Sequence, residues 1–174
     1  MAKLFKTNDD VFSRVEKVME NYEFINHGLV DVKVISTSKS KQMLKLSKAN
    51  ATTCHLVRED SLLTLVIYEE AFEKLSPLQQ ELILRGAFSA INYDIDKDTV
   101  NVNSDPMMAA INMRRTKDVN GNSLGEPYMN AVETSYLVIE VIEEEEKKRK
   151  EEEKERKAAA REAKKQAKLA KSNN

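Results

Sequence analysis

The C-terminal end of the chain alternates short blocks of acidic and basic residues. The acidic run Glu143–Glu146 is followed at once by the basic run Lys147–Lys150, and the acidic-then-basic order partly repeats. Each of the four glutamates stands four residues before a base, which places opposite charges on neighbouring helical turns and stabilises a helix by about 0.2–0.5 kcal/mol per pair. The pattern therefore predicts a long charged single α-helix over residues 143–174 that needs no hydrophobic core.

The tail differs in charge from the rest of the chain. Of 29 acidic and 28 basic residues, 9 and 12 lie between Glu143 and Lys171, which leaves 20 acidic and 16 basic residues in positions 1–142. The segment from Ala158 to Lys171 has the most uneven charge, because it contains five basic residues and a single acidic one, Glu162. This basic end predicts contact with nucleic acid or with an acidic protein surface. The five bases are Arg161, Lys164, Lys165, Lys168 and Lys171.

Length and cysteine content limit the class of protein. The 174 residues suffice for one domain and an appendage, since domains typically contain about 100–150 residues. Cys54 is the only cysteine, which excludes an intrachain disulfide and a thiolate metal cluster. No segment approaches the roughly 20 apolar residues of a membrane span, and the chain does not begin like a secretion signal. We therefore expect a soluble, cytoplasmic protein with no membrane partner.

The part before the tail mixes helical and strand periodicity. Apolar residues recur at helical spacing over positions 8–22 and alternate with polar residues over positions 29–35. Two further apolar runs, at 51–55 and 62–68, are expected to form strands joined as a hairpin, with the second strand central. These patterns predict an α+β domain over residues 1–142, in which a small, mainly antiparallel sheet packs on helices.

A strong helix start follows the second of these strands. Ser76 is placed to cap a helix, Pro77 suits its first position, and Gln79 completes a capping box. The apolar pattern predicts that this helix continues through Phe88 and Ile91 and is buried over most of its circumference.

The region after this helix holds further candidate elements. Positions 99–103 alternate like a short strand, and a methionine-rich helix is expected from Pro106. From Pro127 onward no glycine or proline interrupts the chain, so one long helix with an apolar stripe over 128–142 is expected to lead into the charged tail.

Arg114, Arg115 and Lys117 form a candidate binding group beside the two glycines Gly121 and Gly125. The pattern predicts a mobile loop here. Guanidinium groups offer planar donors to phosphate, so this group is a candidate contact for nucleic acid or another acidic partner. The alternative is a solvated loop without a ligand.

Four lysines in positions 39–48 permit two interpretations. They would guard an exposed sheet edge against aggregation, or they would contact phosphate. The lysines are Lys39, Lys41, Lys45 and Lys48.

The chain contains few groups suited to catalysis. Cys54 and His55 are adjacent in an extended run, so their side chains point to opposite faces and cannot pair. His27 precedes Gly28 at a predicted helix-to-strand turn. We therefore assign no catalytic residue and no cofactor.

Several aspartates are spaced like the ligands of a calcium loop. Thr99 stands where such a loop requires glycine, so turn and helix-cap chemistry is the favoured interpretation and no metal site is assigned. The aspartates are Asp94, Asp96, Asp98 and Asp105.

The segment from Leu62 to Pro106 resembles the middle of a group of bacteriophage proteins. The resemblance rests on a strand, an acidic turn, the sequence Leu75-Ser76-Pro77, a buried helix and Tyr93-Asp94, in that order. Some of these phage proteins are described as metallopeptidases. In their zinc-binding members the helix reads Leu-Ile-x-His-Glu-x-x-His, with two histidines holding zinc and a glutamate acting as base.

The chain departs from that motif at its chemical positions. Arg85 and Ser89 replace the two histidines, and Gly86 replaces the glutamate. The resemblance implies a phage protein whose zinc pocket is closed or reused, and in which small Gly86 lets another element approach the helix.

Together these observations predict a non-catalytic phage accessory or structural protein, located in the host cytoplasm or the virion. It is expected to act as a binding module whose helical tail reaches nucleic acid or an acidic protein. The alternative is a metallopeptidase-like hydrolase with a non-standard or vestigial site that uses carboxylates such as Glu69, Glu70, Asp94 and Asp96. A structural spacer is a third interpretation, and a homo-oligomer would form through the 128–142 stripe.

Overall fold

A computed structural model describes residues 2–49, 62–97, 99–103 and 105–172, with side chains as far as residue 160. The chain divides into two compact units, Met1–Ile139 and Glu140–Asn174. The expected strand at 51–55, with Cys54 and His55, lies outside the described residues.

The first unit contains a four-stranded sheet in the order β1-β2-β4-β3. Its strands are β1 Leu4–Phe5, β2 Asp31–Thr37, β3 Leu44–Lys48 and β4 Leu62–Tyr68. Strand β2 pairs with β1 in antiparallel fashion, and so does β3 with β4, whereas β2 and β4 run parallel over their whole length. The predicted α+β class is confirmed, although the parallel pair was not predicted.

Strand β4 is central because it is apolar on both faces. Leu62, Leu63, Leu65 and Ile67 are completely buried. Strand β3 lies at the edge, where Lys45 and Lys48 are exposed, as expected for an edge guarded by charge.

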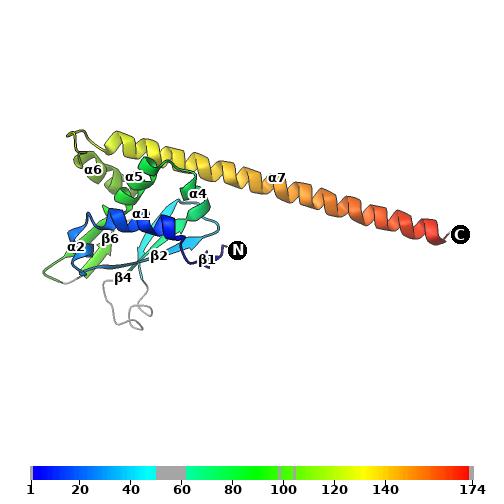
Figure 1. Cartoon of the computed structure of the whole chain (residues 1–174), viewed down its shortest axis with the longest axis horizontal. Coiled ribbons are helices and arrows are strands. Elements are labelled where there is room, and N and C mark those ends of the chain that lie inside the picture. Colours follow the sequence, from blue (N-terminus) through cyan, green and yellow to red (C-terminus); the bar gives the residue numbers. More distant parts are fainter. Residues whose placement is uncertain (1, 50–61, 98, 104, 173–174) are drawn as a thin grey trace. The chain divides into compact units, whose positions relative to one another are not determined.

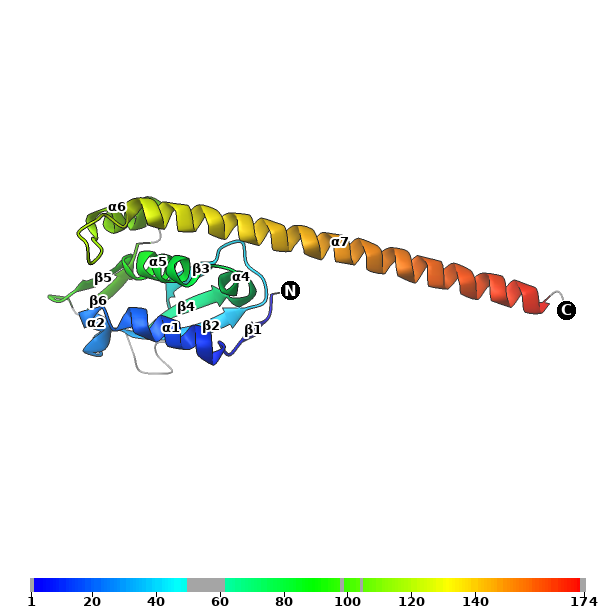
Figure 2. The same ribbon diagram turned by 45° about the horizontal axis from the view of Figure 1, so that its top comes forward.

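Five helices of the first unit precede the long C-terminal helix in the described sequence. They are α1 Asp9–Met19, α2 Glu23–Asn26, α4 Glu69–Glu73, α5 Pro77–Phe88 and α6 Pro106–Arg115. Helices α1 and α5 run side by side next to the sheet (Figures 1 and 2). His27 caps α2 before Gly28, whose φ of 69° requires a glycine-like conformation. The histidine therefore lies at the predicted turn.

Helix α5 begins as predicted but ends earlier. Ser76 Oγ accepts from the Gln79 amide, and the Gln79 side chain accepts from the Ser76 amide, which completes the capping box. The prediction that the helix includes Ile91 is wrong. Ile91 begins β5, Ile91–Asp94, and pairs with Val102 in β6, Thr99–Val102. Strand pairing buries the same apolar side chain that the helical pattern would have buried.

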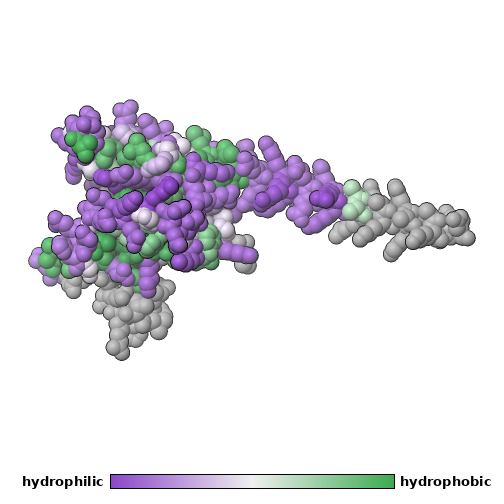
Figure 3. Space-filling model, in the orientation of Figure 1, coloured by the Kyte–Doolittle hydropathy of each residue, from purple (hydrophilic) through white to green (hydrophobic). Residues whose placement is uncertain are grey.

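The last helix, α7 Gly125–Ser172, starts in the first unit and continues to the end of the described chain. Helix α7 is antiparallel to α5 where they meet, because Tyr128 lies against Gly86 and Gln79 donates to Thr134 Oγ1 at 3.3 Å. The predicted long C-terminal helix is therefore confirmed. Its described charged residues form an almost wholly hydrophilic surface (Figure 3).

Candidate functional site

The turn between α6 and α7 is organised by Asp118. Its Oδ1 accepts from the amides of Asn120 at 2.9 Å and Asn122 at 2.7 Å, and its Oδ2 accepts from the Asn122 side chain. These bonds favour the ionised form of the Asp118 carboxyl and so lower its pKa, and the bond from the Asn122 amide has the largest effect. Gly121, with a φ of 83°, lets the chain reverse. The expected loop thus contains a hydrogen-bonded turn, because a short aspartate side chain can satisfy several turn amides at once.

Two residues join the ends of α6 and α7. Ser123 Oγ donates to the Arg114 carbonyl at 2.8 Å and accepts from the Gly125 amide at 3.2 Å. A Cβ at Gly125 would lie 3.0 Å from the Arg114 Cα, so the close approach of the two helix ends favours glycine.

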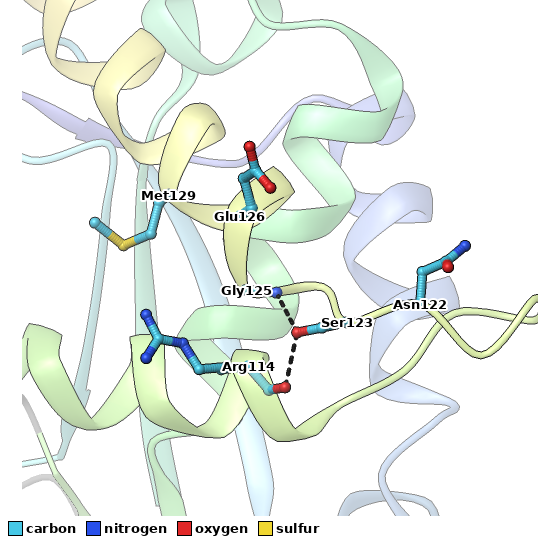
Figure 4. A pocket seen from close by; sticks show the side chains of 6 residues that line it. All are labelled: Arg114, Asn122, Ser123, Gly125, Glu126 and Met129. Atoms are coloured by element: carbon cyan, nitrogen blue, oxygen red, sulfur yellow. Dashed lines mark hydrogen bonds between the residues drawn. The ribbon is translucent and has the colours of Figure 1, made fainter.

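An open pocket of about 590 Å³ lies at this junction (Figure 4). The side chains of Arg114 and Met129 extend to the same side, whereas the Glu126 carboxylate points away from the guanidinium. The pocket can present a cation and an apolar surface, but its lining offers no nucleophile and base within reach of each other. The lining residues are Arg114, Asn122, Ser123, Gly125, Glu126 and Met129.

Of the predicted basic group, only Arg114 lines the pocket. Arg114 and Arg115 lie in the last turn of α6, not in the loop where they were expected, and Lys117 follows in the turn. All three are exposed. Arg114 could be named as a candidate contact from its chemistry, whereas Ser123 could not, because its role in the turn comes from the fold.

The helix positions that correspond to the zinc motif have structural roles. Arg85 forms an ion pair with Glu81, with 2.7 Å between Nη2 and Oε1, and Ser89 Oγ donates to the Gly86 carbonyl at 2.7 Å. A Cβ at Gly86 would lie 2.2 Å from Tyr128 Cε2, so the tyrosine ring occupies the space beside the helix. Gly86 therefore has the packing role that the resemblance implies.

Two tyrosines beside α5 are held in their neutral form. Tyr22 Oη donates to the Arg85 carbonyl at 3.0 Å, and burial raises the pKa of Tyr22 to about 12, although the nearby Arg85 charge opposes the shift. Burial also raises the pKa of Tyr128, with a smaller contribution from Tyr136. The half-buried Tyr22 and the buried Tyr128 thus act as packing groups.

The carboxylates considered for hydrolysis are engaged in the fold or exposed. Glu69 accepts from the Asn8 amide at 3.1 Å and from the buried Ser36 hydroxyl, which is also bonded to Thr7 at 3.1 Å. Because a hydroxyl carries one proton and the ionised carboxylate only accepts, Thr7 donates to Ser36 and Ser36 donates to Glu69. The network joins the chain before α1 to the end of β2. Glu70 is exposed.

The aspartates with calcium-like spacing also serve local structure. Asp94 accepts from the Asp96 and Lys97 amides, and Asp105 caps α6 by accepting from Met107. Asp98 lies outside the described residues. Among the residues with described placement, no group of three or more histidine, cysteine or acidic side chains is arranged to hold a metal ion.

The charged part of α7 contains internal ion pairs. Lys150 Nζ lies 3.1 Å from Glu146 Oε2, and Lys157 Nζ lies 2.5 Å from Glu153 Oε1, both at the predicted spacing of four residues. The five predicted bases of the tail all lie on helical backbone within Arg161–Ser172. They belong to a different compact unit from Arg114, Arg115 and Lys117.

The apolar stripe over 128–142 is divided between two uses. Tyr128, Ala131 and Ile139 are buried within the chain, whereas Tyr136 and Leu137 are 50% and 61% exposed. The homo-oligomer expected from this stripe stays a prediction.

No helix among the described residues is long and apolar enough to serve as a membrane span. Comparison with known protein families, with curated protein sequences and with solved structures finds no match to this chain.

Proposed function

We propose that the chain is a non-catalytic binding module whose C-terminal helix contacts nucleic acid or an acidic protein surface. The observation that carries this proposal is the continuity of α7, which passes without interruption through the paired charges and the basic end. A continuous helix keeps residues three and four positions apart on neighbouring turns, so the basic residues can act together on one partner.

The rest of the chain supports a binding role over a hydrolytic one. The α5 positions that would carry zinc chemistry are used for an ion pair, a helix-end hydrogen bond and contact with Tyr128. Arg114, Arg115 and Lys117 form a second exposed basic group, which we include as a contact for an acidic partner. The resemblance of residues 62–106 to phage proteins supports an accessory or structural role in the virion or the host cytoplasm.

Retention on two immobilised polyanions, heparin and poly-glutamate, tests this proposal. The natural chain is compared with a full-length variant carrying Arg161→Gln, Lys164→Gln, Lys165→Gln, Lys168→Gln and Lys171→Gln. We expect the natural chain to elute at higher salt than the variant from at least one matrix. Elution of both proteins at the same salt from both matrices would refute the role of the tail.

Self-association is a separate part of the proposal. The exposed apolar side chains Tyr136 and Leu137 on α7 are its candidate contacts. Light scattering on the natural chain and on a Tyr136→Glu, Leu137→Glu variant measures it. A natural chain that is monomeric at high concentration would remove this part without affecting the binding proposal.

A further inference from the structure

We infer that the basic end of α7 binds the phosphate backbone of double-stranded nucleic acid without reading its base sequence. The inference rests on the proposed function and names the partner of the same surface.

The geometry of the helix gathers the five bases on one side. Residues 161–171 are helical, and successive residues of an α-helix advance by about 100°. The positions within an arc of about 120° therefore include Arg161, Lys164, Lys165, Lys168 and Lys171, whereas the positions of Ala163 and Ala170 are on the far side of the helix. We call these five positions the basic stripe.

The basic stripe lacks the four-residue acid-to-base spacing of the preceding segment, and Glu162, three residues before Lys165, is the single acidic residue in positions 158–171. Each of the bases at 147–150 follows a glutamate by four residues, but no base of the stripe does so. Within the stripe Arg161 precedes Lys165, and Lys164 precedes Lys168, by four residues. Like charges at this spacing destabilise an isolated helix by about 0.2–0.5 kcal/mol per pair. An external anion would relieve this repulsion, so the stripe is suited to an intermolecular contact.

The composition around the stripe favours nucleic acid over an acidic protein. Stable protein interfaces depend on buried aromatic, methionine or leucine anchors. Residues 143–174 contain no aromatic residue, and Leu169 is the only residue after Ile142 that is apolar and larger than alanine. The contact that remains is electrostatic, which is the sequence-independent part of nucleic-acid binding.

The same composition favours a duplex over a single strand. Single strands are bound by stacking their bases on aromatic side chains, which this segment lacks. The stripe is about 15 Å long, and a duplex presents about nine phosphate charges over that length. Contacts to three to five phosphates are therefore geometrically accessible.

Fluorescence anisotropy with a labelled 20-base-pair DNA duplex tests the inference on the full-length chain. For three to five phosphate contacts, the slope of log affinity against log salt is about −2.7 to −4.5, so affinity falls about 40- to 500-fold between 50 and 200 mM salt. We expect duplexes of unrelated sequence to bind within about threefold of one another, and a single strand of the same length to bind more weakly.

A matched pair of variants locates the contact. The stripe variant carries the five glutamine substitutions given above. The control variant carries Lys147→Gln, Lys148→Gln, Arg149→Gln, Lys150→Gln and Arg156→Gln, which remove the same charge from bases that follow a glutamate by four residues. We expect the stripe variant to lose at least 30-fold in affinity for the duplex, which corresponds to about 2 kcal/mol of binding free energy. The control variant should lose only a few-fold in affinity. Circular dichroism checks that both variants remain helical.

The outcomes separate this inference from the proposed function. Equal losses in the two variants would overturn the assignment of the contact to the basic stripe, and tighter binding of the single strand would overturn the assignment of the partner as a duplex. If the natural chain binds poly-glutamate through the stripe but does not bind the duplex, an acidic protein is the partner and only this inference fails. If it binds neither the duplex, heparin nor poly-glutamate, the proposed function fails as well.

Discussion

Helix α5 and the charged part of α7 are stabilised in opposite ways. Helix α5 is capped at its start and buries half of its residues, including Leu84 and Phe88, which are completely enclosed. In α7 every residue from Lys147 to Ala160 is exposed, and the stabilising contacts run along the helix itself. A helix held by a core has its side chains committed to neighbours. A helix held by its own charges and by alanine keeps its surface available for a partner.

The largest loss of stability is expected from a substitution of Gln80, in the core-held helix α5. This side chain is 2% exposed, and its Nε2 donates to the carbonyls of Phe72 at 2.9 Å and Leu75 at 3.0 Å, while its Oε1 accepts from Arg14. Gln80→Leu removes the donor from buried acceptors, which costs about 1–3 kcal/mol for each group left without a partner. We therefore expect urea unfolding to show a loss of about 2–4 kcal/mol in the free energy of unfolding.

Arg14→Met is the control for this prediction. It leaves both carbonyls satisfied and removes the donor from one buried acceptor, Gln80 Oε1, in place of two, so we expect about half the loss of Gln80→Leu. Equal losses for the two variants would show that Gln80 does not act through the α4–α5 connection.

The next effect concerns the contact between α5 and the start of α7. In an open helix, Gly86→Ala would stabilise by up to about 1 kcal/mol, because alanine is the better helix former. Here the added Cβ would lie 2.2 Å from Tyr128 Cε2, so we expect a loss of about 1–3 kcal/mol in the free energy of unfolding.

A double-mutant cycle with Tyr128→Ala identifies the cause. Once the ring is absent, Gly86→Ala should become neutral or stabilising. A loss of the same size in both backgrounds would mean that the ring is not the obstacle.

Alkaline pH is expected to destabilise the surroundings of α5. Because the pKa of folded Tyr22 is about 12 against 10.0 for the ordinary phenol, the unfolded chain releases a proton between these values while the folded chain retains it. The stability from this group is complete below pH 10 and is lost as pH rises toward 12, with a slope of up to about 1.4 kcal/mol per pH unit. Unfolding measured against pH should show a shallower alkaline decline for Tyr22→Phe. Identical slopes for the two proteins would mean that the fold does not hold the Tyr22 phenol in its neutral form.

The features that could be predicted from the sequence are those whose signals lie within a few residues. The capping box of Ser76 and Gln79 and the charge spacing of the tail are local patterns, so α5 begins where it was expected and the tail is helical. Ile91 was misplaced because a helix face and a strand pairing would both bury it. The parallel pairing of β2 with β4 was missed because alternation indicates which face of a strand is buried but not which strand lies beside it.

The residues of the candidate site also differ in whether a local sequence signal identifies them. Arg114 was recognisable from its chemistry as a candidate contact for an acidic partner, and Gly86 was recognisable as a point where another element approaches α5. The partner of Gly86 was not, because Tyr128 is distant in the sequence and any large side chain of the later helix would have served equally well. Gln80 carried no local signal, because it stands between the polar residues Gln79 and Glu81, and its three partners all lie outside α5.

The smallest effect is expected in the tail, at the opposite end of the pH scale. A hydrogen bond and the charge of Lys157, with a lesser contribution from Arg149, lower the pKa of the Glu153 carboxyl. The helix therefore favours the ionised form, so the contribution of this pair is present above the ordinary glutamate pKa and is lost as pH falls through the lowered value. Lys157→Gln should raise the pKa of Glu153 and leave the unfolding of the first unit unchanged, whereas Lys154→Gln, next to Glu153 in the sequence but on a different side of the helix, should leave that pKa nearly unchanged. Carboxyl chemical shifts recorded through an NMR titration measure both, and equal titration of Glu153 in the natural chain and in Lys157→Gln would mean that the tail is not held by its own ion pairs.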